Sequence, residues 1–533
     1  MLDEAKAAQP DAAAAAHLRS VAIQLNGLDF QLSLLMAQVL SEEYGSRIHL
    51  YTRTERERRG IERVVASTLP PGIVETITVT RQIDTGLTDV VADEPAVVAA
   101  ARAWEERLGE TFNELLLDHR QLSRGYIPGG TGIPTALKVR QASYAQTINA
   151  VTQVLEFWEE EKRTKDLTLI LNAEKWVACF CYASGIQYRR RVLARHENLH
   201  YWSPDEYFTD PFRKQCYDEL KEWPPVSESL RYSAQISKNK QNLLTHSYSY
   251  ILRTIFRNLA RTGYHRLRGE RHSPSGFWAD LRMNFRPRKG YRVYKRYAQT
   301  ELRDLIGRDF IYFPLHKEPE TDFVAASPEF LNQLNAISSL SRDLPAGAIL
   351  AVKEHIPAFG LRPDNFYEQL SYLKNVVMVD AHESSIGLLM EARATATIAG
   401  TAGLEAAILG RPVIQFGRHS LNHFLDHVFT VYREDDVGRY LRDIFNGNVD
   451  LECAKSDGAR FLEATKRSCF DMGDFLVSTV AGRGASLENA KTACQGLLKS
   501  LEGGVVGDQS WVLADEAKAD IGTGRRYCAP VSN

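Results

Sequence analysis

The chain lacks the features that mark several common classes of protein. Its 533 residues carry 65 Lys and Arg against 67 Asp and Glu, so no overall charge of one sign suits the whole molecule to a polyanion. No run reaches the roughly 18 apolar residues that span a bilayer. The first twenty residues are rich in alanine, contain three acids and lack the basic start of a signal peptide. We therefore expect a cytoplasmic protein.

Cysteine is scarce, and the spacings of metal or redox sites are missing. The chain has seven cysteines, and the closest pair, Cys179 and Cys181, lacks the C-x-x-C spacing. A sparse, odd count favours reduced thiols in a cytosolic compartment. The H-E-x-x-H, G-x-S-x-G and phosphate-loop lysine motifs do not occur in their required context, and no convincing D-x-D pair is present. The sequence predicts neither a metal site nor a cofactor.

The length requires more than one domain. A single hydrophobic core stops growing near roughly 250–300 residues, so 533 residues predict two domains and their connections. Changes in composition and pattern divide the chain into six segments. These are a flexible leader at 1–18, an N-terminal Rossmann-like domain at 19–235, a basic helical connector at 236–300, a C-terminal Rossmann-like domain at 301–454, crossing helices at 455–502 and a disordered tail at 503–533.

In the N-terminal domain, short apolar runs alternate with helical patterns. Strands are predicted at 21–26, 48–52 and 167–172, and helices follow at 30–40 and from about Lys175. Such alternation is typical of a parallel sheet that is covered on both faces. The region 81–160 is mainly helical in pattern.

The segment 253–297 is strongly basic and rich in aromatic residues. Thirteen Arg or Lys stand against two acids, Glu270 and Asp280. A solvated connector with arginines paired elsewhere is one interpretation. Peripheral contact with an anionic membrane, or with a phosphorylated acceptor, is the other that we keep. Nucleic acid suits the same composition but is the least favoured, and we expect no nucleic-acid partner.

The region 301–446 has the clearest pattern. Five short apolar strands are predicted at 310–315, 348–352, 376–380, 394–399 and 412–416, separated by helical segments at 327–342, 364–374, 384–393 and 403–409. Each strand has the composition of one that is buried on both faces. Right-handed crossovers turn such a series into a doubly wound α/β sheet.

Polar, basic and glycine-rich positions follow these strands one after another. Ligands of open α/β sheets bind beyond the carboxyl ends of the strands, so we expect these side chains to line one nucleotide site. The predicted nucleotide-binding residues are His316, Lys317, Lys353, His355, Ser384, Ser385, Gly400, Thr401, Ala402, Gly403 and Glu405.

Each residue type has a physical reason to meet a phosphate or a ribose. Small residues at 400–403 leave the N–H groups of a helix start open to an anion. Ser384 and Ser385 open another helix, where serine caps well. Lys353 and His355 would neutralise phosphate charge, and Glu405, expected in the first turn of its helix, would accept ribose hydroxyls. The alternatives are helix capping for Glu405 and a polar core position for His355.

The same stretches resemble the capsule polysaccharide biosynthesis protein family. The resemblance lies in Val352-Lys-Glu-His-Ile-Pro357, in the pair Ser384-Ser385, and in Gly400-Thr-Ala-Gly-Leu-Glu-Ala406 followed by Gly410-Arg-Pro-Val413. Ile356 separates His355 from Pro357, where the family pattern has histidine and proline adjacent. The resemblance implies a metal-independent glycosyltransferase of the GT-B architecture, with two Rossmann-like domains facing a central cleft. It also implies a nucleotide-sugar donor, for which CMP-linked Kdo is the family's suggestion.

By the same resemblance, the N-terminal domain would bind the acceptor and supply a catalytic carboxylate. Asp29 and Glu197 are the predicted catalytic residues, and Glu174 and His196 are further candidates. The acceptor is expected to be a cell-surface polysaccharide or a lipid-linked glycan, on the inner face of the cytoplasmic membrane. Two other functions stay open: a sugar-nucleotide epimerase of the same fold, and a non-catalytic scaffold of a surface-glycan assembly or export complex.

Overall fold

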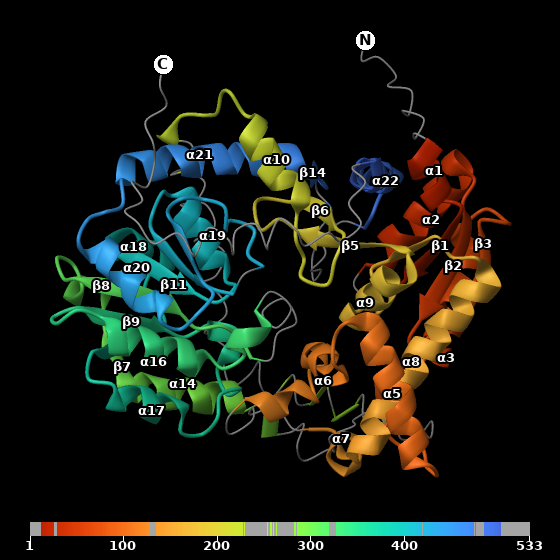
Figure 1. Cartoon of the computed structure of the whole chain (residues 1–533), viewed down its shortest axis with the longest axis horizontal. Coiled ribbons are helices and arrows are strands. Elements are labelled where there is room, and N and C mark those ends of the chain that lie inside the picture. The colour runs from red at the N-terminus through yellow and green to blue at the C-terminus, as the bar shows by residue number, and fades with distance from the viewer. Residues whose placement is uncertain are drawn as a thin grey trace. The chain divides into compact units, whose positions relative to one another are not determined.

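The computed structural model describes residues 12–25, 29–127, 135–227, 285–318, 327–417, 419–473 and 484–502, with a few single residues between them. These residues form two compact units, and neither is continuous in sequence (Figure 1). Unit 1 takes the described residues of Met1–Leu115, Ala142–Asp218 and Ala464–Ser510. Unit 2 takes those of Leu116–Gln141 and Glu219–Glu463.

Unit 1 is built on a seven-stranded sheet of order β14-β6-β5-β4-β1-β2-β3. The strands β5, β4, β1, β2 and β3 are parallel, and β6 and β14 continue the sheet in antiparallel pairing. The order reverses between β1 and β4, which makes a topological switch point. The strands are β1 (Ser20–Gln24), β2 (Arg47–Thr52), β3 (Val74–Val79), β4 (Leu169–Leu171), β5 (Gln187–Leu193), β6 (Leu199–Ser203) and β14 (Phe470–Asp471).

The helices of unit 1 come from both ends of the chain. They are α1 (Ala12–His17), α2 (Phe30–Tyr44), α3 (Glu55–Thr68), α4 (Ile83–Gly86), α5 (Glu94–Leu108), α6 (Phe112–Leu115), α8 (Tyr144–Lys165), α9 (Lys175–Ser184), α10 (Pro211–Glu219) and α22 (Leu487–Glu502). Figure 1 shows α22, in dark blue, beside α1 and α2, in red, and α22 packs against both. Its apolar residues share one buried core with those of α2, β1 and β2.

Unit 2 is built on a seven-stranded sheet in which every pairing is parallel. Its order is β13-β12-β11-β8-β9-β10-β7. Counted from β8, the order is three-two-one-four-five-six, which is that of a dinucleotide-binding Rossmann sheet, with β7 added at one edge. The switch point lies between β8 and β11. The strands are β7 (Ala298–Thr300), β8 (Phe310–Pro314), β9 (Ile349–Lys353), β10 (Val376–Val379), β11 (Ala394–Thr397), β12 (Val413–Phe416) and β13 (Val428–Val431).

Helices and short 3-10 turns cover this second sheet (Figure 1). The covering α-helices are α14 (Arg286–Tyr297), α16 (Gln333–Asp343), α17 (Phe366–Tyr372), α18 (Ser385–Glu391), α19 (Thr401–Ile408) and α20 (Asp436–Phe445), and unit 2 also includes α7 (Leu137–Gln141). The 3-10 turn η7 (Ile356–Ala358) follows β9, and α21 (Leu451–Ser468) carries the chain back to unit 1. One buried apolar core joins residues of β8, β9 and β11 to those of α16, α17 and α20.

The two α/β units with largely parallel sheets confirm the predicted fold class of two Rossmann-like domains. All five strands predicted in the C-terminal domain and all three in the N-terminal domain are present, within two residues of the predicted ends. The pattern missed β3, β5, β6, β7, β13 and β14. A central cleft between the units stays a prediction.

Several further expectations meet the structure only in part. Residues 12–17 of the predicted flexible leader form α1, whose run of alanines has the highest helix propensity. The segment 503–533, and nearly all of the basic segment before residue 285, lie outside the described residues. Cys179, Cys181, Cys216, Cys469 and Cys494 are free thiols. Across the described ranges, no helix combines the length and apolarity needed to cross a bilayer.

Candidate functional site

The predicted residues of unit 2 gather at one edge of its sheet. Because β8, β9, β10 and β11 are parallel neighbours, the loops that follow them leave from the same edge. His316 and Lys317 follow β8, Lys353 ends β9, and the other predicted residues follow β9, β10 and β11. Their contact with a nucleotide remains a proposal.

His316 lies at the switch point and joins the ends of β8 and β11. Its Nε2 lies 3.0 Å from the hydroxyl of Thr397 and accepts the backbone N–H of Ile398 at 3.3 Å. Because Nε2 accepts from a backbone N–H, a neutral His316 carries its proton on Nδ1. The Thr397 hydroxyl also accepts the N–H of Gly400 at 3.1 Å. One imidazole thus orients the loop that begins α19.

The loop that begins α19 requires its first glycine. A Cβ on Gly400 would lie 2.4 Å from His316 Cε1 and 2.7 Å from Thr397 Oγ1. Gly400 is the N-cap of α19, and Thr401 and Ala402 open the helix in half-buried positions. The first N–H groups of a helix have no partner within it, and the helix dipole makes that end positive. The geometry suits a bound anion beside His316.

Lys353 and the serine pair join β9 to α18. The buried ammonium of Lys353 donates to Ser385 Oγ at 2.9 Å. Ser384 is the N-cap of α18, and its hydroxyl accepts the N–H of Gly387 at 3.0 Å. Both serine oxygens therefore accept hydrogen bonds within the protein, while a hydroxyl can still donate one to a ligand. His355 is exposed and is the N-cap residue of η7.

Glu405 lies deeper than expected. Helix α19 begins at Thr401, so Glu405 is its fifth residue and lies in the second turn rather than the first. Its side chain is buried, with 6% of its surface exposed. The sequence pattern placed the start of the helix at residue 403. This two-residue error put Glu405 too close to the N-terminus of the helix.

Two residues of the site escaped the sequence analysis. Thr397 bonds His316 and Gly400, and Gln333 holds both backbone groups of His316, accepting its N–H at 2.6 Å and donating to its carbonyl at 3.1 Å. Thr397 could have been noticed, because Thr395 and Thr397 alternate with alanine in a strand that is otherwise apolar and buried. No local pattern marks Gln333, because its role depends on where α16 packs.

Unit 1 has a comparable edge at its own switch point, where Asp29 follows β1. One carboxylate oxygen of Asp29 pairs with the guanidinium of Arg191 in β5, and the other is buried with no partner among the described residues. Arg191 also lies 2.8 Å from His200 Nδ1. Burial, and then the charge of Arg191, lower the pKa of His200 to about 3, so its ring is neutral at pH 7.

Glu174, which precedes α9 at the end of β4, belongs to the same edge. Its Oε1 accepts from Gln24 at 2.8 Å and from Arg53 at 2.9 Å. Glu197 instead lies exposed in the turn between β5 and β6, with a φ of 47°. His196 in the same turn is buried, and burial followed by the charges of Lys466 and Arg213 lowers its pKa to about 4.

A second group of ionisable residues gathers at α9 and is partly buried. Ligand atoms of Glu110, Cys179 and Glu206 lie within 4.8 Å of one another. The Nζ of Lys175 is 3.7 Å from Glu110 Oε2 and supplies positive charge to the group. Burial, and then the charges of Asp205 and Glu110, raise the pKa of Glu206 to about 8.

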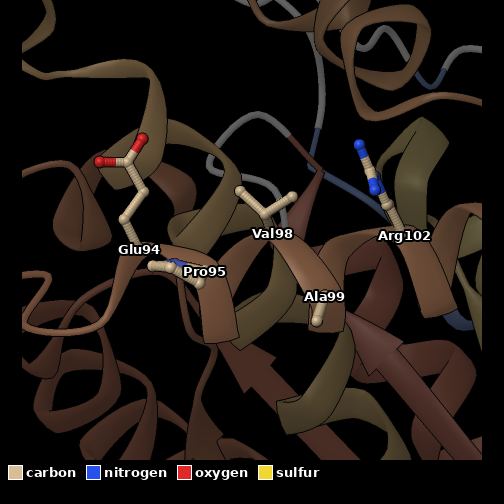
Figure 2. Close-up of a pocket in the computed structure, with 5 residues that line it drawn as sticks. All are labelled: Glu94, Pro95, Val98, Ala99 and Arg102. Carbon is tan, nitrogen blue, oxygen red and sulfur yellow. The ribbon is translucent and has the colours of Figure 1, made fainter.

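Figure 2 shows a hollow on unit 1 that is separate from these groups. Its lining side chains all project from α5, and they combine one acid, one guanidinium and three apolar residues. They are Glu94, Pro95, Val98, Ala99 and Arg102. Polar groups do not converge there as they do at a small-molecule site.

Comparisons with known proteins bear on unit 2 above all. Residues 287–423 match the family described as capsule polysaccharide biosynthesis protein. No curated protein matches the chain.

Several solved structures are similar over longer stretches at low identity. A KpsC beta Kdo 2,7 transferase of Thermosulfurimonas dismutans is 17% identical, with 57% of this chain and 80% of that one covered and a TM-score of 0.28. Anabaena HepE in complex with UDP is 10% identical, with 90% and 100% covered and a TM-score of 0.28. The UDP-GlcNAc 2-epimerase of Neisseria meningitidis bound to UDP-GlcNAc is 9% identical, with 84% and 98% covered and a TM-score of 0.21. At these TM-scores the likenesses assign neither activity nor substrate.

The matched stretch begins in α14, contains β8 to β12, and ends in the loop that follows β12. It therefore includes every residue of the candidate site in unit 2. Over residues 287–423, the chain is therefore similar to the capsule polysaccharide biosynthesis proteins, the family that its sequence motifs resemble.

Proposed function

We propose that the protein is a glycosyltransferase that moves a sugar from a nucleotide-activated donor to a surface polysaccharide or a lipid-linked acceptor. The observation that carries the proposal is the meeting of His316 with the start of α19 at the switch point of a Rossmann sheet. The family match over the same residues supports a role in capsule polysaccharide synthesis.

The donor's phosphates would lie at the positive end of α19. Transfer of the sugar leaves a nucleotide phosphate with added negative charge, which must be stabilised as the bond breaks. The N–H groups at 401–402, the imidazole of His316 and the ammonium of Lys353 supply that stabilisation from one edge of the sheet. Since these groups are cationic or proton-donating, the proposed reaction needs no metal ion. CMP-linked Kdo is the donor that the sequence resemblance favours.

The reaction needs either a base that deprotonates the acceptor hydroxyl or a nucleophile that attacks the sugar. We assign the carboxylate that serves in either way to Asp29 of unit 1. Its second oxygen is buried without a partner among the described residues, and Arg191 holds the first. Glu197 remains the second candidate, but its exposed position in a turn gives it no comparable support. Binding of the acceptor by unit 1 is part of the proposal.

Contact with an anionic membrane surface through the basic segment 253–297 is also part of the proposal. Of that segment, α14 is described, and it contains six Arg or Lys and no acid. Lys289, Arg292, Lys295 and Arg296 are exposed along it. A lipid-linked acceptor would reach a cytoplasmic enzyme at such a surface.

The test begins with the binding of CMP-, UDP- and GDP-sugars, measured by thermal stabilisation and by calorimetry. We expect one nucleotide class to bind, and His355→Ala to weaken its binding while leaving the melting temperature unchanged, because His355 is exposed. Lys374→Ala is the matched control. Lys374 is also exposed, but it precedes β10 and so lies at the edge of the sheet opposite to the candidate site. Unchanged binding in His355→Ala would remove this residue from the site.

The reaction itself separates the remaining functions. Incubation of the bound donor with and without a glycan acceptor is followed by NMR. A transferase consumes donor in the presence of acceptor, whereas interconversion of the free donor would identify an epimerase. Absence of any nucleotide binding would contradict the proposal and leave the scaffold role.

A further inference from the structure

A buried ionic cluster contacts the loops of the candidate nucleotide site of unit 2. Arg362, in the loop between η7 and α17, is 6% exposed. Its guanidinium donates to Glu354 through Nε at 2.8 Å and through Nη2 at 2.7 Å, and to Glu318 through Nη1 at 2.8 Å. Both carboxylates are buried as well. The three side chains form one connected group, here called the Arg362 cluster.

The Arg362 cluster binds the backbone of the two loops that carry the candidate histidines. Arg362 Nη2 donates to the carbonyl of His316, and Glu354 Oε1 accepts the N–H of His355 at 2.6 Å. Glu318 accepts the N–H of Gln333 at 3.4 Å, and Gln333 in turn holds both backbone groups of His316. The cluster thus connects the loop after β8 to the loop after β9.

Two tyrosines fix the cluster from its other side. The hydroxyl of Tyr367 donates to Glu354 Oε2 at 2.6 Å, and the hydroxyl of Tyr294 accepts the N–H of Glu354 at 3.1 Å. Tyr294 also donates to the carbonyl of Val379 at the end of β10. Three neighbouring strand ends, those of β8, β9 and β10, are therefore tied together through Glu354 and Arg362.

The stability of unit 2 alone does not account for this arrangement. Two acids and one guanidinium must all lose their hydration, and well-packed apolar side chains of similar volume often serve as well or better. What an apolar core cannot supply is a set of directional bonds to the backbone of two loops. Burial lowers the pKa of Arg362, but the adjacent carboxylates of Glu354 and Glu318 outweigh burial and raise it, so the guanidinium stays charged.

We propose that Arg362 is a positioning residue that holds the loops after β8 and β9, so that His316 and His355 act on the same nucleotide phosphate. The inference rests on the proposed nucleotide site but concerns residues that do not touch the ligand. Arg362→Lys keeps the charge and loses the planar fork that reaches three acceptors at once.

The experiment compares wild type with Arg362→Lys and Gln333→Ala. The second variant leaves every charge in place and removes only the side chain that holds both backbone groups of His316. Arg213→Lys is the matched control, because Arg213 is also fully buried and ion-paired, with Asp210, but lies in unit 1. The first readout is the ¹⁵N–¹H imidazole spectrum, in which His316→Asn identifies the His316 signals.

We expect the His316 signals to shift or broaden in Arg362→Lys and in Gln333→Ala, and to stay unchanged in Arg213→Lys. The second readout is the calorimetric affinity for CMP, UDP and GDP. We expect it to fall about tenfold or more in both unit 2 variants, because small misplacements of binding groups are costly. Unchanged His316 signals and unchanged affinity in folded Arg362→Lys would overturn the inference.

The two readouts separate this inference from the proposed function. If wild type binds none of the three nucleotides, the proposed function fails, while the His316 spectrum still decides whether Arg362 positions that loop. If wild type binds and only the affinity of Arg213→Lys falls, the loss reflects general destabilisation and the inference is wrong. Should Arg362→Lys not fold, Gln333→Ala carries the same two readouts.

Discussion

At the scale of single residues, the start of α19 is the most sensitive point of the candidate site. The Cβ of Gly400→Ala would overlap His316 Cε1 and the Thr397 hydroxyl, so the loop or the imidazole must move. We expect a loss of stability of about 1–3 kcal/mol, as for other overpacked sites, and a clear loss of nucleotide affinity. Urea unfolding and calorimetry measure the two effects.

The matched control for Gly400→Ala is Gly60→Ala in α3. A Cβ on Gly60 meets nothing within 4 Å, so alanine there should stabilise the helix by roughly 0.5–1 kcal/mol and leave nucleotide affinity unchanged. If Gly400→Ala bound nucleotide as tightly as wild type, the start of α19 would not be the phosphate site.

The half-buried Glu206 predicts a pH dependence of stability. Its folded-state pKa is raised to about 8 from an ordinary value of 4.5, first by burial and then by Asp205 and Glu110. The folded protein therefore holds this proton more tightly than the unfolded chain. The resulting stability is complete below pH 4.5 and is lost as pH rises through about 8, at about 1.4 kcal/mol per unit of pKa difference.

Glu206→Gln isolates this effect, because an amide stays neutral at every pH. Urea unfolding of both proteins between pH 5 and 9 gives the difference in free energy of unfolding. We expect the advantage of wild type over Glu206→Gln to shrink from pH 5 to about pH 8 and then to level off. A difference that is constant with pH would show that Glu206 titrates normally in the folded protein.

The sequence predicted those residues of the site whose positions depend only on the strand that precedes them. His316, Lys353, Ser384 and Thr401 follow predicted strands, so strand ends were enough to bring them to one edge. Arg362 and Gln333 were missed, because their partners lie on other loops and helices and no spacing connects them in sequence. Asp29 was predicted from its place after β1, but Arg191, which holds it, lies more than 160 residues away.

At the scale of elements, α22 has a structural role that its place in the sequence conceals. Leu497 is fully buried in the core of unit 1, and Trp202 Nε1 donates to the carbonyl of Ala493 at 2.9 Å. We expect Leu497→Ala to lower the free energy of unfolding of unit 1 by about 2–5 kcal/mol. Leu487→Ala, on the same helix and 42% exposed, should change it by less than about 0.5 kcal/mol.

Unfolding followed by tryptophan fluorescence measures the effect, since Trp158 and Trp202 are buried in unit 1. Equal effects of the two leucine substitutions would contradict the packing of α22. Nucleotide affinity serves as an internal control, because the candidate phosphate site belongs to unit 2 and neither leucine lies in it.

Strands that are buried on both faces could be predicted from the sequence. Strands that form only because a neighbouring strand pairs with them were missed. Strands such as β4 and β10 are continuous apolar runs, which mark them without any context. By contrast, β7 is Ala-Gln-Thr and β14 is two residues long, and each exists only because a neighbouring strand pairs with it. The strand β5 contains three arginines in succession, a composition that no strand pattern predicts.

At the scale of the whole molecule, ligand effects should follow the division into units. Hydrogen exchange with the bound nucleotide should show protection at 316–318, 353–358, 382–387 and 397–403, which lie at the carboxyl edge of the unit 2 sheet. Nucleotide alone should leave β1 and α9 of unit 1 unchanged. Protection confined to the carboxyl edge of the unit 1 sheet would show that the donor binds to unit 1, and would contradict its assignment to unit 2.

The interleaving of the two units has a consequence for biosynthesis. A ribosome releases residues in chain order, and the last strand and helix of the unit 2 sheet, β13 and α20, are complete by residue 445. Unit 1 begins first but still awaits α22, which ends at Glu502, before its core can close. The nascent chain must therefore keep an early hydrophobic surface unsealed while a later domain forms. A chaperone that binds exposed apolar surface during translation would therefore be needed longest on the part of the protein that is made first.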